Sequence, residues 1–156
     1  MSFSRLLVPV DFSDRSVHAL RYAVSFGRPF SAAIDVVHVW EPPAYVAPDM
    51  MVSLSEEAGH RTIAELARTE ISREMKSLIE ELEGRDDLEV QGRLEVGPVA
   101  ETIVQLANDD EHDLIIMATH GRRGLSRLVL GSVAEQVVRL ADCPVLTLRA
   151  PDVSGR

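Results

Sequence analysis

The chain has 156 residues, of which 46% are hydrophobic, and its formal net charge at pH 7 is −9. This length is typical of one domain, so we expect residues 1–156 to form a single domain with a substantial core. No apolar run approaches the roughly 18 to 20 residues of a membrane-spanning helix. Because an acidic surface repels nucleic acids and anionic membranes, the composition argues against both as partners.

The cysteine content and the N-terminal residues predict a cellular location. The single cysteine, Cys143, cannot form an internal disulfide, as is typical of reducing compartments. The N-terminal residues "MSFSRLLVPVDF" lead directly into a strand-like run, without the layout of a signal peptide. We therefore expect a cytoplasmic protein.

Apolar strand-like runs alternate with segments of helical periodicity along the chain. The predicted strands are "LLVPV" (6–10), "IDVVHVW" (34–40), "LEVQGRLEV" (88–96), "DLIIMA" (113–118) and "CPVLTLR" (143–149). Apolar residues at helical spacing lie between them at Val17, Leu20 and Val24, at Ile71, Met75, Leu78 and Leu82, at Val99, Ile103 and Leu106, and in "SVAEQVVRLA" (132–141). The three prolines of "EPPAYVAPD" (41–49) predict a loop, and the order of elements is βαβαβαβαβ.

This alternation predicts an α/β fold, a Rossmann-like three-layer sandwich with a five-stranded parallel sheet. The first and fourth strands are the most apolar, whereas the third alternates apolar and polar residues and suits a sheet edge. A strand order of 3-2-1-4-5 fits these features. Ligands in such sheets bind at the carboxyl ends of the strands, beside the point where the strand order reverses. Residues 9–11 and the segment "ATHGRRGLSRLVLGS" (118–132) would meet there.

The segment 118–132 contains three glycines and three arginines within an otherwise acidic chain, and it ends where the last helix begins. Glycines allow close approach, and a helix N-terminus offers free N–H groups, so the pattern favours phosphate binding. The alternative is a structural turn, with Ser132 and Glu135 forming a helix capping box. The segment matches neither G-x-x-x-x-G-K-[ST] nor G-x-G-x-x-G, so both interpretations stay open.

Three stretches carry a resemblance to a known family: "RLLVPVDFSDRSVHAL" (5–20), "VVHVW" (36–40) and "HGRRGLSRLVLGSVAEQVVRLADCPVLTLR" (120–149). Together they resemble the universal stress protein family, whose fold is Rossmann-like and of the adenine nucleotide alpha hydrolase-like type. The ATP-binding branch of that family carries the motif Gly-x2-Gly-x9-Gly-Ser/Thr. Here Gly121, Gly131 and Ser132 match this motif, whereas Ala118 stands at the position of the first glycine. Alanine is compatible with that position if its φ is negative.

The resemblance implies a site for ATP or another adenine nucleotide, with Mg²⁺ or Mn²⁺ held mainly through the phosphates. Asp11 would bind the ribose hydroxyls or help to orient a bound cation, although an aspartate here also suits a helix cap. The backbone of Val39 would meet the adenine edge. The phosphates would be held by Gly121, Gly131, Ser132 and Val133. The full predicted set comprises Pro9, Val10, Asp11, Val39, Met117, Ala118, His120, Gly121, Arg122, Gly131, Ser132 and Val133.

The resemblance further implies a stress-response binding module that acts as a sensor or regulator through protein partners. It also implies a homodimer formed through the last strand, at Val145, Leu146, Thr147 and Leu148. Because the sequence offers no nucleophile–base pair and no cluster of metal ligands, we predict no catalytic residue and no metal site of the protein's own. A slow ATPase and a nucleotide-free interaction protein remain alternatives.

The sequence pattern gives two histidines structural roles. His38 lies within a buried strand and is interpreted as a core histidine with a satisfied hydrogen bond. His112 lies near the end of a predicted helix and is interpreted as a surface residue.

Overall fold

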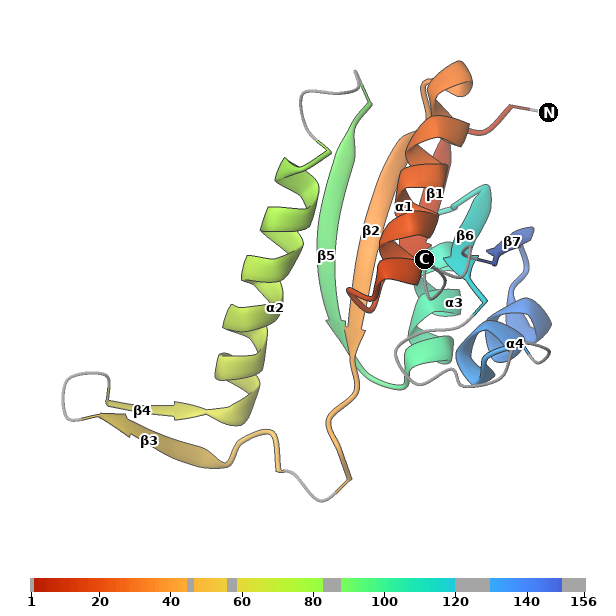
Figure 1. Ribbon diagram of the computed structural model, residues 1–156. Coiled ribbons are helices and arrows are strands. Elements are labelled where there is room, and N and C mark those ends of the chain that lie inside the picture. Colours follow the sequence, from red (N-terminus) through yellow and green to blue (C-terminus); the bar gives the residue numbers. More distant parts are fainter. Residues whose placement is uncertain (1, 45–46, 56–58, 83–87, 120–129, 150–156) are drawn as a thin grey trace, which may run out of the picture.

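The main sheet is parallel and has the predicted strand order (Figure 1). The computed structural model describes residues 2–44, 47–55, 59–82, 88–119 and 130–149. Within them the sheet runs in the order β5-β2-β1-β6-β7, which is 3-2-1-4-5 by order along the chain. Its strands are β1 (Arg5–Pro9), β2 (Ala33–Trp40), β5 (Val90–Val96), β6 (Leu114–Ala118) and β7 (Val145–Leu148). The α/β fold predicted from the sequence is therefore confirmed.

Helices cover both faces of this sheet. Helices α1 (Asp14–Gly27) and α2 (Ile63–Glu80) lie on one face, and α3 (Val99–Asp109) and α4 (Ser132–Leu140) lie on the other. A short 3₁₀ helix, η1 (Arg28–Phe30), follows α1. Two core clusters result, one on each face. Leu6 and Val8 of β1 point into the first cluster, and Leu7 points into the second.

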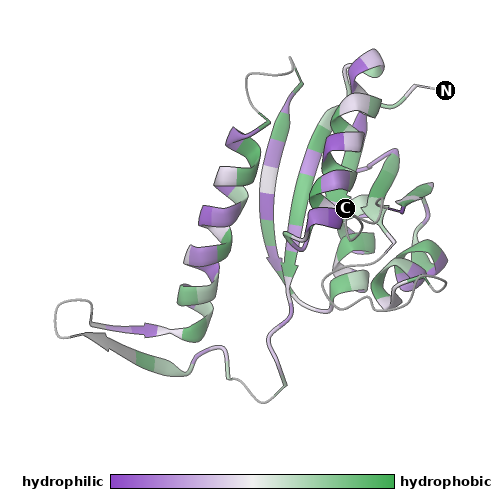
Figure 2. Ribbon diagram, viewed as in Figure 1, coloured by the Kyte–Doolittle hydropathy of each residue, from purple (hydrophilic) through white to green (hydrophobic). Residues whose placement is uncertain are grey.

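The burial of the strands explains their order. The central residues of β1 and the first four residues of β6 are buried, because helices cover both of their faces. Strand β5 has only half-buried and exposed residues and lies at one edge of the sheet. Figure 2 shows this contrast, since β6 is hydrophobic along its length whereas β5 mixes hydrophilic and hydrophobic residues.

A short antiparallel hairpin, β3 (Met51–Ser55) and β4 (Gly59–Thr62), was not predicted from the sequence. It lies beyond the N-terminal end of α2, away from the main sheet (Figure 1), and its main contacts with other elements are with α2. A capping box between Thr62 and Glu65 begins α2. Hydrogen bonds from Thr62 to the Glu65 carboxylate lower the pKa of that group. The hairpin therefore leads directly into a well-defined helix start.

Helix α3 begins immediately after a glycine–proline pair. Pro98 is the residue that precedes the helix, at the cap position, and the first helical residue is Val99. Gly97 has a φ of +153°, and a Cβ atom there would lie 2.9 Å from Oγ1 of Thr102. Both the conformation and the close approach require glycine. In the part of the chain that the structure describes, no helix is both long enough and apolar enough to span a membrane.

Candidate functional site

The carboxyl ends of β1, β2 and β6 meet at one edge of the main sheet. Strand β1 pairs in parallel with both β2 and β6, so the three strands end side by side. The N–H of Val10 donates to the carbonyl of Val37 at 2.8 Å and ties the end of β1 to β2. This edge brings together six of the residues predicted for the nucleotide site: Pro9, Val10, Asp11, Val39, Met117 and Ala118.

The start of α4 lies at the same edge. The N–H of Gly131 donates to the carbonyl of Thr119 at 2.7 Å, and the N–H of Thr119 donates to the carbonyl of Leu148 on β7. The chain therefore returns to the end of β6 immediately before α4 begins. This contact positions three further predicted residues beside the strand ends: Gly131, Ser132 and Val133. The predicted residues His120, Gly121 and Arg122 lie outside the described residues.

The N-terminus of α4 is capped by a glycine, not by Ser132. Gly131 has extended backbone angles, with φ −62° and ψ 149°, and its carbonyl accepts the N–H of Glu135. Ser132 is already the first helical residue and is exposed, so the capping-box interpretation of Ser132 and Glu135 was wrong. Because glycine has no side chain, no cap side chain occupies the N–H groups of the first turn. Such a helix start is suited to bind an anion.

Asp11 lies in the turn between β1 and α1 and is half-buried. Its Oδ1 accepts hydrogen bonds from the Ser13 N–H at 3.1 Å and from the Ser13 hydroxyl at 2.5 Å, while its own N–H donates to Oγ of Ser16. The cap of α1 is Ser13, so the alternative reading of Asp11 as the helix cap was wrong. An ionised carboxylate can accept about four hydrogen bonds, so it can bind Ser13 and a ligand hydroxyl at once.

His38 of β2 contacts the same turn. Its Nδ1 lies 2.8 Å from the carbonyl oxygen of Val10, which confirms the predicted hydrogen bond, although His38 is half-buried and not a core residue. The Phe12 ring lies over the imidazole, with ring centroids 4.7 Å apart and planes inclined by 30°. Phe12 has a φ of +59°, in the left-handed region that bulky residues seldom occupy.

The conformation of Ala118 bears on the departure from the family motif. Among the described residues, the non-glycine residues with positive φ are Phe12, Ser31 and Glu111. Ala118 is the last residue of β6 and pairs with Leu148 of β7. The backbone conformation at this position therefore does not require glycine. Alanine in place of glycine can affect a bound ligand only through its methyl group.

A buried charged cluster lies at the opposite edge of the sheet, near the amino ends of the strands. His112 has a completely buried side chain, and its Nε2 lies 2.8 Å from Oδ2 of Asp35 on β2. Nε of Arg5 lies 2.8 Å from the same oxygen. The interpretation of His112 as a surface residue was therefore wrong. Sequence reasoning missed this cluster because its members are far apart in the chain, although an aspartate inside the apolar run 34–40 is an available signal.

The same cluster places Asp35, Asp110 and His112 near enough to share a metal ion, with one ligand atom of each within 4.8 Å of the others. Arg5 binds Asp35, and Arg93 binds the Asp110 carboxylate, so two guanidinium groups balance the two carboxylates. The hydrogen bond from Arg93 lowers the pKa of the Asp110 carboxyl. This charge balance opposes a cation, and the cluster is best described as an ion-pair network that joins β1, β2, β5 and the end of α3.

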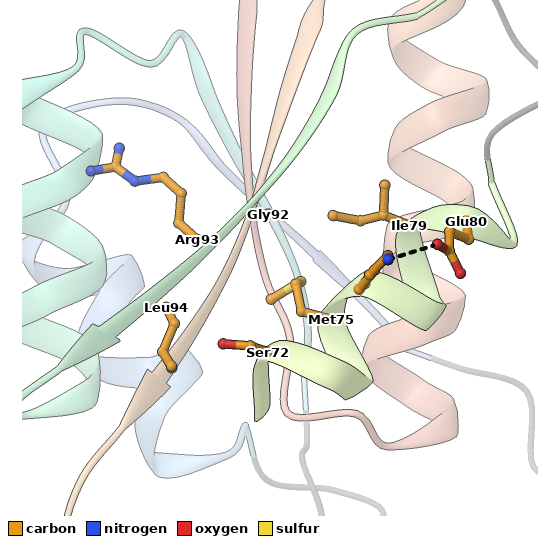
Figure 3. Close-up of a pocket in the computed structure, with 8 residues that line it drawn as sticks. Ser72, Met75, Ile79, Glu80, Gly92, Arg93 and Leu94 are labelled. Carbon is orange, nitrogen blue, oxygen red and sulfur yellow. Dashed lines mark ion pairs between the residues drawn. The ribbon is translucent and has the colours of Figure 1, made fainter. Parts of the chain in front are cut away.

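A cavity of about 350 Å³ lies between α2 and β5 (Figure 3). Met75 and Ile79 of α2 lie over Gly92, where a Cβ atom would come within 2.6 Å of both side chains. Figure 3 shows Arg93 pointing away from α2, and the polar rim includes the Lys76–Glu80 ion pair at 3.6 Å. Of the residues predicted for the nucleotide site, none that the structure describes lines this cavity.

The fold and the arrangement of the strand ends agree with the family resemblance, and comparison with known proteins establishes the family. Residues 2–149 match the model of the universal stress protein family. The chain belongs to this family. The universal stress protein MJ0531 of Methanocaldococcus jannaschii is 32% identical over 149 residues, which cover 96% of this chain and 84% of that protein.

Solved universal stress protein structures share the fold. The structure of MJ0577, a universal stress protein of Methanocaldococcus jannaschii, covers 97% of this chain and 99% of its own, with 25% identity and a TM-score of 0.77. A universal stress protein in complex with cAMP is 18% identical, with a TM-score of 0.70, and covers 96% of this chain and 98% of its own. A universal stress protein from Archaeoglobus fulgidus in complex with dAMP is 24% identical, with a TM-score of 0.59, and the match covers 94% of this chain and 98% of that chain.

Proposed function

We propose that this universal stress protein binds ATP or another adenine nucleotide at the carboxyl ends of β1, β2 and β6. The observation that carries the proposal is the start of α4, where a glycine cap leaves the first turn without a cap side chain beside the end of β6. A helix N-terminus of this kind favours a phosphate through its N–H groups and its dipole. Two universal stress proteins of the same fold carry cAMP and dAMP, which supports an adenine nucleotide as the ligand class.

Each proposed contact follows from the position of its residue. Asp11 would accept hydrogen bonds from the ribose hydroxyls, and the backbone of Val39 would meet the adenine edge. The N–H groups of Ser132 and Val133 would bind phosphate oxygens at the start of α4. Mg²⁺ or Mn²⁺ would be held mainly by the phosphates, since Mg²⁺ is commonly bound through substrate phosphates together with only one or two carboxylates. Pro9, Val10, Met117, Ala118, His120, Gly121 and Arg122 complete the proposed site.

Gly131 offers a direct test, because its φ and ψ are accessible to any residue. In Gly131→Asp, the carboxylate can cap the first turn of α4, which should stabilise the helix by a few tenths of a kcal/mol. The same carboxylate occupies the proposed phosphate position with a negative charge, so ATP affinity should fall at least about tenfold. Stability and affinity would thus change in opposite directions.

The experiment compares wild type, Gly131→Asp and the matched variant Gly131→Asn by calorimetric titration with ATP and Mg²⁺ and by thermal unfolding. Asparagine caps the helix equally well but carries no charge. The ATP affinity of Gly131→Asn should therefore lie between those of the wild type and Gly131→Asp. If Gly131→Asp binds ATP as tightly as the wild type, the proposed phosphate position is wrong. If the wild type binds no adenine nucleotide, the proposed function fails as a whole.

We further propose a cytoplasmic, single-domain protein that forms a homodimer through β7 and signals to protein partners. Strand β7 is a sheet edge, and its residues Val145, Leu146, Thr147 and Leu148 are all half-buried. An edge strand presents unpaired backbone groups that can pair with a second copy. Light scattering should give the mass of a dimer, and a proline at Thr147 should shift that mass toward the monomer because proline lacks the N–H that pairing requires.

A further inference from the structure

His38 contacts the residues on both sides of Asp11. Its Nδ1 lies 2.8 Å from the carbonyl oxygen of Val10, and its ring packs against the ring of Phe12 at 4.7 Å. Because a carbonyl oxygen only accepts hydrogen bonds, Nδ1 must carry a hydrogen and donate it. One side chain of β2 therefore holds the backbone before Asp11 and the side chain after it.

The backbone at Phe12 needs such support. Its φ of +59° lies in a region that non-glycine residues seldom occupy and that persists only when the surroundings enforce it. Packing of the Phe12 ring on the imidazole supplies one restraint. The hydrogen bonds of Asp11 to Ser13 and Ser16 supply a second restraint from the side of α1. The direction of the Asp11 carboxylate follows from this turn.

We propose that His38 is a positioning residue of the nucleotide site, which fixes the Asp11 carboxylate toward the ribose hydroxyls. This role rests on the proposed function, since it concerns the same ligand. His38 also precedes Val39, whose backbone is proposed to meet the adenine edge. The imidazole thus links the strand that meets the base to the turn that meets the sugar.

The first test compares ATP with 2′,3′-dideoxy-ATP, which lacks the hydroxyls that Asp11 would bind. His38→Ala should weaken ATP binding about tenfold, while the affinity for the dideoxy analogue should change far less. His38→Asn keeps an N–H donor near the Val10 carbonyl and should recover part of the ATP affinity. Equal losses for both nucleotides would overturn the role, since a general structural defect does not distinguish them.

A double-mutant cycle gives a second readout. In the Asp11→Ala background, His38→Ala should cause little further loss of ATP affinity, because the carboxylate that it positions is absent. Independent, multiplicative losses would contradict the proposal. Circular dichroism and thermal unfolding of each variant check that the fold persists, and His38→Asn keeps the test decisive if His38→Ala does not fold.

The ligand-free protein provides a readout that does not depend on nucleotide binding. Nitrogen chemical shifts of His38 in the wild type should report the tautomer with hydrogen on Nδ1, and the Asp11 carboxyl resonance should shift in His38→Ala. The other tautomer, or an unchanged Asp11 resonance, would overturn the positioning role. If these ligand-free results hold and the wild type binds no adenine nucleotide, the proposed function fails while His38 still positions Asp11.

Discussion

Asp35 permits a quantitative test of the ion-pair network at the amino ends of the strands. Its side chain is 5% exposed, and the carboxylate accepts hydrogen bonds from Nε2 of His112 and Nε of Arg5, both at 2.8 Å. Replacing it with alanine removes both bonds. The Arg5 side chain is 39% exposed and can regain water, whereas that of His112 is 0% exposed and cannot. The loss of stability therefore comes mainly from the unpaired His112 Nε2.

The size of the effect follows from these contacts. A hydrogen bond to a charged group contributes about 1.5–3 kcal/mol, and the Asp35 carboxylate accepts one from Arg5 and one from His112. Since Arg5 recovers part of its solvation, we expect Asp35→Ala to lower the free energy of unfolding by about 3 kcal/mol. For a chain of this length, that loss lowers Tm by about 6–12 °C.

The assay is urea unfolding at pH 7, followed by circular dichroism, together with thermal unfolding. Asp35→Asn is the matched control, because it keeps the side-chain shape and one acceptor oxygen, and it should lose less stability than Asp35→Ala. A loss below about 1 kcal/mol for Asp35→Ala would refute the reasoning, since it would equal the contribution of an exposed salt bridge.

Three further predictions concern single residues. Arg93 lowers the pKa of Asp110 below its ordinary value of 3.8, so the stability that this pair adds is present above pH 3.8 and is lost as the pH falls through the lowered pKa. Urea unfolding of wild type and Asp110→Asn should therefore differ most near neutral pH and converge in strong acid. Ala118→Gly should cost about 0.5–1 kcal/mol of stability and change ATP affinity by less than about tenfold; a larger change would mean that the methyl group contacts the ligand. Burial raises the pKa of the Cys143 thiol, so iodoacetamide should alkylate it slowly at pH 7, and rapid alkylation would contradict its half-buried position.

The main sheet could be predicted from the sequence because the residue pattern of each strand is local. The residues Leu6–Val8 and Leu114–Met117 are apolar without alternation, which identifies strands covered on both faces, and the mixed pattern of 88–96 identifies an edge. The strand order, and the placement of residues 9–11 and the start of α4 at the same edge of the sheet, then follow from general rules for parallel sheets.

The sequence did not suffice where a contact joins distant residues or where a motif has two possible registers. The burial of His112 depends on Asp35, 77 positions away, so a local pattern cannot reveal it. The S-x-x-E pattern at Ser132 suggested a cap, but the hydrogen bond from Gly131 to Thr119 holds the chain so that the helix begins one residue earlier than such a cap requires. The hairpin was missed because "GHRT" (59–62) has no apolar alternation.

That hairpin has a consequence for how the chain can vary. Those residues of β3 and β4 whose burial the structure describes (51, 52 and 60–62) belong to neither core cluster, and β4 contacts α2. Insertions, deletions or an attached fluorophore at β3–β4 would leave the main sheet and both clusters intact. Relatives of this protein are thus free to differ in length between β2 and α2, and the same place is where a reporter group can be introduced without disturbing the strand ends that form the proposed site.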